Sequence, residues 1–231
     1  MPEGFTASLI GGWIHKDSLR RPYFGFDGEL THFSKHGRYS DYTVRIGGYS
    51  NHGLEDFTLL LNYYHFTKLK ELGPSWYNRN FLTLNLTKQM TPILDQPLLL
   101  QSGMFGLPYF NTLPIGDPRI TGDFRTTLKG ESVFYNMKKY LGFRFAPFAF
   151  VNAILLKHPE MDFSKSDIYS AIGGGIRTRN ENFIFGTIEL KGYYFPRTLP
   201  GMKGWRIELN SNLQFKFNST FIKQPDFVIP N

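Results

Sequence analysis

The chain has 231 residues with a formal net charge of +7, and it contains 23 Phe, 13 Tyr and 3 Trp but no cysteine. This aromatic content is too high for a solvated, disordered tail. The lack of cysteine excludes a disulfide framework, a thiolate nucleophile and a cysteine zinc site. The basic residues are scattered, and their densest groups, 18–21 and 137–139, are short. We therefore expect no nucleic-acid partner, because phosphate binding requires a clustered basic face.

The longest apolar stretches, such as 145–156, are interrupted, in this case by Pro147 and Asn152. A membrane-spanning helix needs about 18 or more apolar residues in a row, so none is expected. The first residues include Glu3 and lead directly into an alternating pattern, which is not typical of a secretory signal. The chain is therefore expected either to stay in the cell or to be a piece of a longer exported precursor.

A hydrophobic period of two runs through nearly the whole chain and predicts about eleven β-strands. In chain order these cover residues 5–15, 24–31, 41–46, 57–68, 79–87, 97–106, 123–134, 141–156, 168–179, 184–194 and 205–218. No helix of three turns is needed anywhere. The pattern predicts an all-β, antiparallel fold.

The last predicted strand, 205–218, shows the alternation most clearly. Its odd-numbered positions are apolar with the exception of Ser211, and its even-numbered positions are all polar. A helix would mix the two sets around its circumference, whereas a strand separates them onto two faces. At about 14 residues, this strand is also well above the usual length of 5–6.

Turn residues separate the predicted strands at 35–37, 51–53, 72–74, 113–118, 158–162, 180–182 and 199–204, where Gly, Pro, Asn and Asp gather. The spacing of about 20 residues is roughly twice that of a compact β-sandwich. No interdomain linker is recognisable. We expect a single domain over 1–231, in which 219–231 form a C-terminal tail.

Long antiparallel strands with one apolar and one charged face fit either a soluble sandwich, whose apolar faces meet in a core, or a transmembrane β-barrel, whose apolar faces meet lipid. The strand length and the aromatic residues near strand ends favour the barrel. Closure also removes the hazardous edges of an open sheet. Charged residues of both signs are then predicted to line the lumen: Arg125, Lys129, Glu131, Arg144, Arg177, Arg179, Glu189, Lys191, Arg206 and Glu208.

Motifs in the C-terminal half resemble the barrel of the bacterial surface antigen family, which includes outer-membrane assembly factors and two-partner secretion transporters. The resemblance covers roughly residues 98–218. It is carried by Leu100-Gln101-Ser102-Gly103-Met104-Phe105-Gly106, Ile120-Thr121-Gly122-Asp123-Phe124-Arg125, Gly130-Glu131-Ser132-Val133-Phe134-Tyr135, Leu141-Gly142-Phe143-Arg144-Phe145-Ala146-Pro147-Phe148-Ala149-Phe150-Val151 and Ile172-Gly173-Gly174-Gly175-Ile176-Arg177. The N-terminal third matches in pattern only.

This resemblance implies a barrel of about sixteen strands in the bacterial outer membrane, usually preceded by periplasmic domains, that inserts or passes polypeptides. The expected partners are outer-membrane lipid, client polypeptides and periplasmic domains. Three features depart from the family. The visible strands, about 10–12, make only part of such a barrel; Thr121-Gly122-Asp123 stands where the family has an Arg-Gly-aromatic signature; and a tail follows Phe217.

The favoured hypothesis is thus a non-catalytic outer-membrane barrel acting in protein assembly or transport, without cofactor or metal. One alternative is a smaller pore or scaffold barrel without insertase activity. Another is an outer-membrane lipid hydrolase in which His32 takes a proton from Ser34, since the two residues would share a strand face. The remaining histidines show no metal-ligand spacing.

Two further features have structural interpretations. Gly173-Gly174-Gly175 is followed by a predicted strand and lacks the Lys-Ser/Thr of a phosphate loop, so the glycines are expected to relieve crowding or to permit curvature. Arg177 and Arg179 are expected either to bind an anion or to form ion pairs with Glu189 or Glu208.

Overall fold

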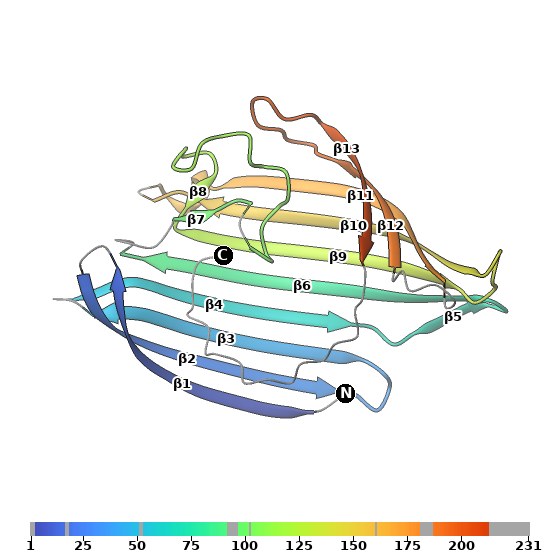
Figure 1. The fold of residues 1–231 in the computed structure, drawn as a ribbon, viewed down its shortest axis with the longest axis horizontal. Helices are drawn as coiled ribbons and strands as arrows, with labels where there is room; N and C mark the ends of the chain where they lie inside the picture. The colour runs from blue at the N-terminus through green and yellow to red at the C-terminus, as the bar shows by residue number, and fades with distance from the viewer. Residues whose placement is uncertain are drawn as a thin grey trace.

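The computed structural model describes residues 3–16, 19–50, 53–91, 97–101, 103–159, 161–180 and 187–212, and the side chains of residues 16, 19, 179, 180 and 212 are not described. Most of the described residues are in β-strands (Figure 1). The strands are β1 (Gly4–Lys16), β2 (Leu19–Phe33), β3 (Tyr39–Ser50), β4 (Leu54–Phe66), β5 (Lys70–Gly73), β6 (Trp76–Met90), β7 (Leu98–Leu99), β8 (Thr121–Gly122), β9 (Phe124–Asn136), β10 (Phe143–Lys157), β11 (Asp167–Asn180), β12 (Thr187–Tyr194) and β13 (Trp205–Asn212).

A single antiparallel sheet of 11 strands contains all of these strands except β7 and β8. Its order is β1-β2-β3-β4-β6-β9-β10-β11-β12-β13, and the short β5 pairs beside β6. Each strand therefore lies next to its neighbour in sequence, apart from the excursions between β4 and β6 and between β6 and β9. The predicted all-β, antiparallel architecture is confirmed.

The sheet does not close on itself within the described residues. β1 pairs only with β2, and β13 pairs only with β12, so these two strands form its edges. The predicted strand 205–218 is observed as β13 up to Asn212, and residues 213–218 and the predicted tail 219–231 lie outside the described residues. Closure into a barrel thus stays a prediction.

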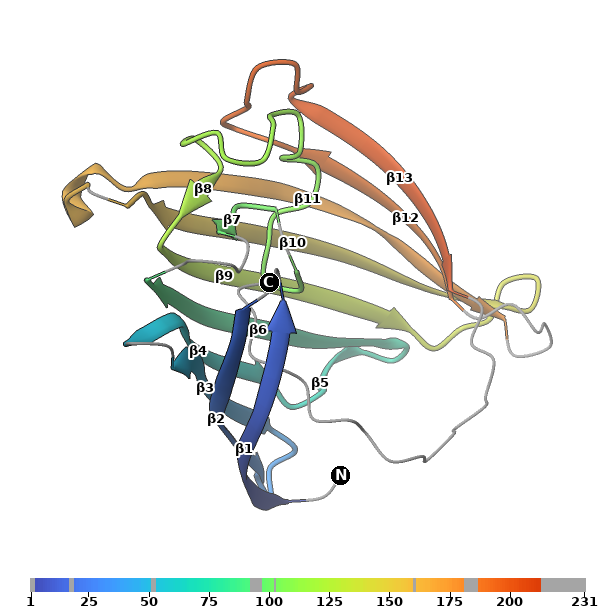
Figure 2. The same cartoon turned by 60° about the vertical axis from the view of Figure 1, so that its left-hand side comes forward.

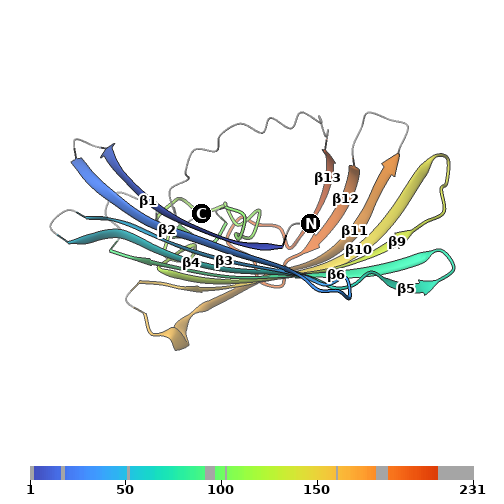
Figure 3. The ribbon, with the colours of Figure 1, turned by 90° about the horizontal axis from the view of Figure 1, so that it is seen from below.

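One predicted strand is wrong. Of residues 97–106, only Leu98 and Leu99 are in a strand, and they pair with Thr121 and Gly122 in a separate two-stranded sheet. The other described residues of 97–120 are irregular and lie inside the curve of the large sheet (Figures 2 and 3). Residues 98–100, Leu107, Phe110 and Ile120 are buried there, and a short apolar run in a buried loop resembles a buried strand in periodicity.

The large sheet is strongly curved, and its two faces differ in chemistry. The convex face exposes apolar side chains on every long strand. Leu9, Leu84 and Leu209 are examples, with exposed fractions of 88%, 40% and 71%. Other members of this convex band are Phe5, Trp13, Phe24, Leu30, Tyr42, Leu61, Leu128, Phe134, Val151, Ile168, Ile172, Ile188, Leu190, Tyr194, Trp205 and Ile207. The apolar faces therefore do not pack against each other.

Strand length is the second feature of the sheet that matters for function. β2, β6 and β10 each have 15 residues, which at about 3.3 Å per residue correspond to roughly 50 Å. Such strands exceed the 9–11 residues that cross a bilayer obliquely. In the described part of the chain, no helix is long and apolar enough to span a membrane; the one helical segment there is a 3-10 turn at Phe163–Lys165.

Candidate functional site: the concave face and its inner segment

The charged residues predicted to line an interior all occupy the concave face where their side chains are described. The registers place Phe150 opposite both Glu131 and Gly173, and Lys191 opposite both Gly175 and Glu208. By alternation, one face carries Arg125, Lys129, Glu131, Arg144, Arg177, Glu189, Lys191, Arg206 and Glu208. Arg179 belongs to β11, but its side chain is outside the described residues. That this face encloses a lumen stays a prediction.

Four of these side chains form an ion-pair network across β9, β11 and β12. The Arg177 guanidinium donates to both carboxylate oxygens of Glu131, at 2.7 and 2.8 Å, and also to Glu189. Lys191 pairs with Glu189 at 2.6 Å. The Arg177 guanidinium also lies 4.1 Å from the centre of the Phe148 ring. Bidentate pairing and ring stacking hold this arginine in one orientation, so Arg177 serves as the ion-pair partner of Glu189 and Glu131.

Residues 97–120, which we call the inner segment, lie against this charged face. Arg125, which is fully buried, donates to the carbonyl of Leu99 at 2.6 Å. Lys129 donates to the carbonyl of Met104 at 2.5 Å, and the Thr127 hydroxyl donates to the carbonyl of Phe105 at 2.8 Å. Alternate residues of β9 thus satisfy the backbone of the inner segment, which buried carbonyls require.

An apolar cluster anchors the inner segment. Leu100, Leu107, Phe110 and Ile120 are fully buried. They pack with buried residues of β9 to β12 and of the loop after β12: Val133, Phe148, Phe150, Ile154, Leu156, Tyr169, Ala171, Tyr193, Phe195 and Leu199. Phe110 meets the rings of Tyr169 and Phe195 edge-on at 5.4 and 5.6 Å. Fully burying such side chains contributes about 1.5–3 kcal/mol each, so the segment is held as a folded part of the interior.

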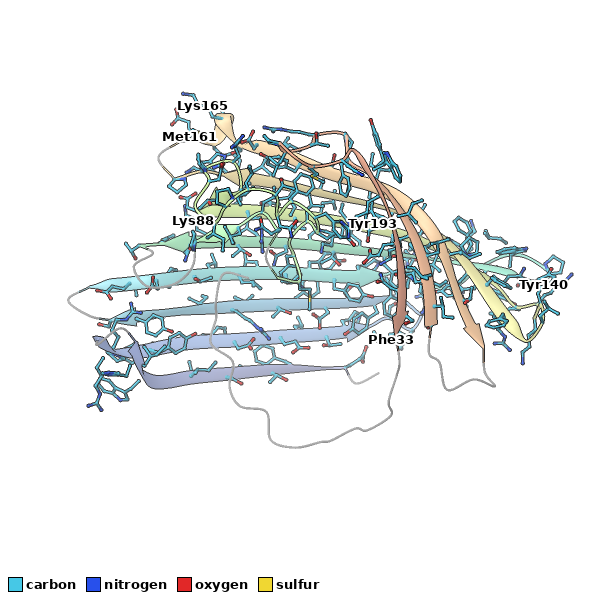
Figure 4. The ribbon with its side chains drawn as sticks, turned by 45° about the horizontal axis from the view of Figure 1, so that its top comes forward. Phe33, Lys88, Tyr140, Met161, Lys165 and Tyr193 are labelled. Carbon is cyan, nitrogen blue, oxygen red and sulfur yellow. The ribbon has the colours of Figure 1, made fainter. Side chains whose placement is uncertain are left out.

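Tyr109 connects the inner segment to the last two strands. Its ring meets that of Tyr193 edge-on at 5.4 Å, and the Arg206 guanidinium lies 3.9 Å from its centre. Tyr193 lies on the inner side of β12 (Figure 4) and hydrogen bonds to Glu208 at 3.2 Å. Burial, assisted by the hydrogen bond and the charge of Glu208, raises the pKa of Tyr109 to about 12. Tyr109 therefore remains a neutral hydrogen-bond donor at physiological pH.

The exposed tip of the inner segment is stabilised locally. Asp117 accepts hydrogen bonds from the backbone and the guanidinium of Arg119. The side-chain bond is the main reason that the pKa of Asp117 falls to about 2. The carbonyl of Arg119 in turn accepts a hydrogen bond of 2.9 Å from the hydroxyl of Tyr169, which ties the end of the segment to β11.

A hollow of about 430 Å³ opens on the concave face beside the ion-pair network. Its lining combines charged and aromatic side chains, including Tyr64, Phe81, Lys129, Glu131, Arg177 and Lys191. Groups of both signs next to aromatic rings can hold polar and apolar parts of a peptide together. No metal-binding group of three or more His, Asp or Glu is found among the described residues.

The glycine triplet of β11 lies where two phenylalanine rings cross the concave face. A Cβ on Gly173 would lie 2.6 Å from the Phe150 ring, and one on Gly175 would lie 2.8 Å from the Phe148 ring. A Cβ on Gly175 would also meet the carbonyl oxygen of Leu190 at 2.1 Å. The glycines thus allow the rings and the neighbouring strand to approach closely, which agrees with the expectation that they relieve crowding.

The His32 and Ser34 pair does not lie on one strand face. β2 ends at Phe33, so Ser34 is in the following turn, where its Oγ accepts a hydrogen bond from the His36 backbone N–H at 3.3 Å. The Nδ1 of His32 lies 3.5 Å from the Glu3 carboxylate. This geometry does not orient His32 as a base toward Ser34.

Comparison of the chain with models of known protein families, with curated proteins and with solved structures found no match.

The inner segment is the part of this site that the sequence did not indicate. Two of its aromatic residues, Tyr109 and Phe110, stand between the predicted strand 97–106 and the predicted turn 113–118. Gly103, Gly106 and Pro108 interrupt the apolar residues there. Glycine and proline at such close spacing indicate a loop rather than a strand. They are the feature of the sequence from which the irregular conformation of this segment could have been predicted.

Proposed function

We propose that this chain forms part of the wall of a bacterial outer-membrane β-barrel that acts in the assembly or transport of other polypeptides and catalyses no reaction of its own. The proposal has three parts: membrane embedding, a filled interior and a role with polypeptides. Each part rests on a different observation and has its own test.

The observation that carries the proposal is the contrast between the two faces of the sheet. Soluble monomers rarely expose contiguous apolar patches larger than a few hundred Å², yet the convex band continues from β1 to β13. The concave face of the same strands holds ion pairs and polar side chains. Apolar residues outside and charged residues inside are typical of a barrel whose solvent is lipid.

Closure of the sheet into a barrel is expected in the same lipid environment. The edges of β1 and β13 present backbone groups that find no partner strand among the described residues. An unpaired strand edge in hydrocarbon costs several kcal/mol per unsatisfied group. In a membrane the two edges are therefore expected to pair, either with each other or through further strands.

The inner segment supports a filled interior, and the motif resemblance supports a role with polypeptides. A folded segment against the concave wall favours a filled interior over an open pore. The resemblance of 98–218 to the surface antigen barrels supports a role in protein assembly or transport, and the mixed-charge, aromatic hollow offers contacts for a polypeptide. Lipid, client polypeptides and periplasmic domains are the proposed partners.

Embedding is tested with single-cysteine variants, because the natural chain has no cysteine. Leu84→Cys places a fluorescent label on the convex face, and Thr83→Cys, the adjacent residue, places it on the concave face. After reconstitution into vesicles, brominated lipid is expected to quench the label at position 84 strongly and that at position 83 weakly. Equal quenching at both positions, or none, would refute membrane embedding.

The filled interior and the role with polypeptides have separate readouts. A plugged barrel is silent in planar bilayers, whereas large, steady conductance would favour the smaller open pore. Depletion of the protein in its host is expected to lower the amounts of other outer-membrane proteins or of secreted polypeptides. Unchanged levels of both would contradict a role in assembly or transport.

A further inference from the structure

The convex face has two adjoining hollows, of which the first lies at the end of the sheet where β5 is found (Figure 1) and the second extends toward the middle of the sheet. We propose that together they bind one anionic phospholipid, with its headgroup in the first and an acyl chain in the second. This inference deepens the proposed function, on which it rests, because it assigns a specific lipid to one place on a lipid-facing wall.

The first hollow, about 640 Å³, is basic. Arg38 from the β2–β3 turn and Lys68 and Lys70 from the β4–β6 connection contribute three cations to its lining, against the single carboxylate of Glu71. These four side chains give the lining a net charge of three minus one, or +2. Within the described part of the chain, none of the three cations has a carboxylate at ion-pair distance. The hollow therefore complements a lipid headgroup with a net negative charge.

Neutral polar groups complete this hollow. Asn78 and Asn80 of β6 and Thr67 also line it. The Asn78 amide donates to the Ser132 hydroxyl at 2.9 Å, and the Ser40 hydroxyl lies 3.0 Å from Nδ1 of His65. The convex face is thus polar at this level, which matches the headgroup region where a membrane-facing surface changes from apolar to wet.

The second hollow, about 610 Å³, continues toward the apolar band. It shares His65, Thr67 and Asn80 with the first hollow, so the two are contiguous. Small residues make the depression: Gly130 and Ala149 lie between the larger side chains of Leu82, Val151 and Ile172. A groove with an apolar floor, continuous with a basic hollow, matches the shape of an amphiphile whose charge is negative.

The size and chemistry of the pair select a phospholipid over a free anion. A free phosphate would use only the basic hollow and would gain nothing from the groove over Gly130. A zwitterionic lipid would fill the groove, but the cation of its headgroup would oppose the net positive charge of the hollow. An anionic lipid uses both hollows without this opposition. Each lysine or arginine near such a lipid contributes a modest attraction, so two of them give about tenfold or more in affinity.

The test is lipid retention by the purified chain in detergent, measured by native mass spectrometry with phosphatidylglycerol and phosphatidylcholine as probes. We expect phosphatidylglycerol to bind about tenfold more tightly. The double variant Lys68→Gln/Lys70→Gln is expected to abolish this preference. Lys138→Gln/Lys139→Gln, which removes the same charge from the neighbouring β9–β10 turn, is expected to retain it.

The groove is tested by filling it. Gly130→Leu places a side chain in the second hollow, where a Cβ meets nothing closer than Val151 at 3.5 Å, and both lipids are expected to bind less. Gly192→Leu adds the same side chain elsewhere on the convex face, where the nearest atom lies at 3.9 Å, and binding is expected to be unchanged. If Gly130→Leu fails to fold, Gly130→Val provides a smaller filling.

Several outcomes overturn the inference. These are equal binding of the two lipids, equal loss in the two lysine double variants, full displacement of the lipid by inorganic phosphate, or a preference for a multiply phosphorylated glycolipid. The quenching experiment at positions 83 and 84 separates this failure from that of the proposed function. A chain that embeds in vesicles without a lipid preference refutes the specific site alone.

Discussion

The two halves of the curved sheet use the same alternating strands but have different interiors. In β9 to β12 the concave face carries the inner segment, and Phe148, Phe150 and Tyr193 are buried beneath it. In the middle of β1 to β3 the concave face carries polar residues that are partly exposed, such as Thr43 and the pair Asp27 and Arg45. The difference teaches that the inner segment buries the middle of the concave face in the half of the sheet that it covers.

The largest expected effect comes from removing the aromatic anchor of the covered half. Phe110→Ala leaves a cavity among buried rings and is expected to destabilise the chain by about 3–5 kcal/mol. Urea unfolding measures the loss, and trypsin should cleave faster after Arg119, at the exposed tip of the inner segment. Thr43→Ala in the open half is the control, with an expected change below about 0.5 kcal/mol. Equal effects would show that the inner segment does not stabilise its half.

A comparison of two arginines sharpens the contrast. Arg177→Ala leaves Glu131 and Glu189 without their shared cation, and we expect a loss of about 2 kcal/mol after allowance for partial exposure. Arg45→Ala removes the half-exposed pair with Asp27, which is worth about 0–1 kcal/mol. High salt should weaken the Arg45 pair more. If both variants lose the same stability, the ion-pair network of Arg177 is no more stabilising than the half-exposed pair of Arg45 and Asp27.

The glycine triplet offers a third comparison, of intermediate size. Gly175→Ala forces a Cβ toward the Leu190 carbonyl and the Phe148 ring, and we expect it to cost about 1–3 kcal/mol. At Gly192, on the adjacent strand, the nearest atom to a new Cβ is 3.9 Å away, so Gly192→Ala should be nearly neutral. Matched thermal unfolding of the two variants measures the difference, and a neutral Gly175→Ala would argue against close packing there.

The smallest expected effect concerns the alkaline behaviour of Tyr109. Its pKa is raised from 10.0 to about 12 in the folded chain, so the stability that neutral Tyr109 supplies is fully present below pH 10 and is lost as the pH rises through about 12. The tyrosinate absorbance of the parent minus that of Tyr109→Phe gives the titration of this residue alone. A midpoint near 10 in that difference curve would exclude a buried Tyr109.

Alternation in the sequence was sufficient to predict the sheet, because side-chain direction in a strand depends only on position. The same rule placed the described charged candidates, from Arg125 to Glu208, on one face. It does not specify which opposite charges meet: Glu131 and Arg177 are 46 residues apart and pair across an intervening strand. Such contacts depend on register, which the sequence pattern alone leaves open.

The inner segment was missed for a different physical reason. Leu98, Leu99 and Leu100 form a short apolar run, and burial against a sheet and membership of a strand both favour such a run. The segment is held as a loop by contacts with residues distant in sequence, such as those of Phe110 with Tyr169 and Phe195. Ser34 illustrates the importance of a strand boundary, since β2 ends at Phe33 and Ser34 therefore does not share a strand face with His32.

The position of the inner segment along the chain constrains how the protein matures. Residues 97–120 come before β9 to β12, yet these later strands supply most of the surface on which the segment rests. The segment must therefore wait, with its leucines and aromatic rings uncovered, until four more strands have been added. Because such distant contacts form slowly, the nascent chain passes through a stage in which a chaperone would find this stretch accessible, and that stage ends when β12 arrives.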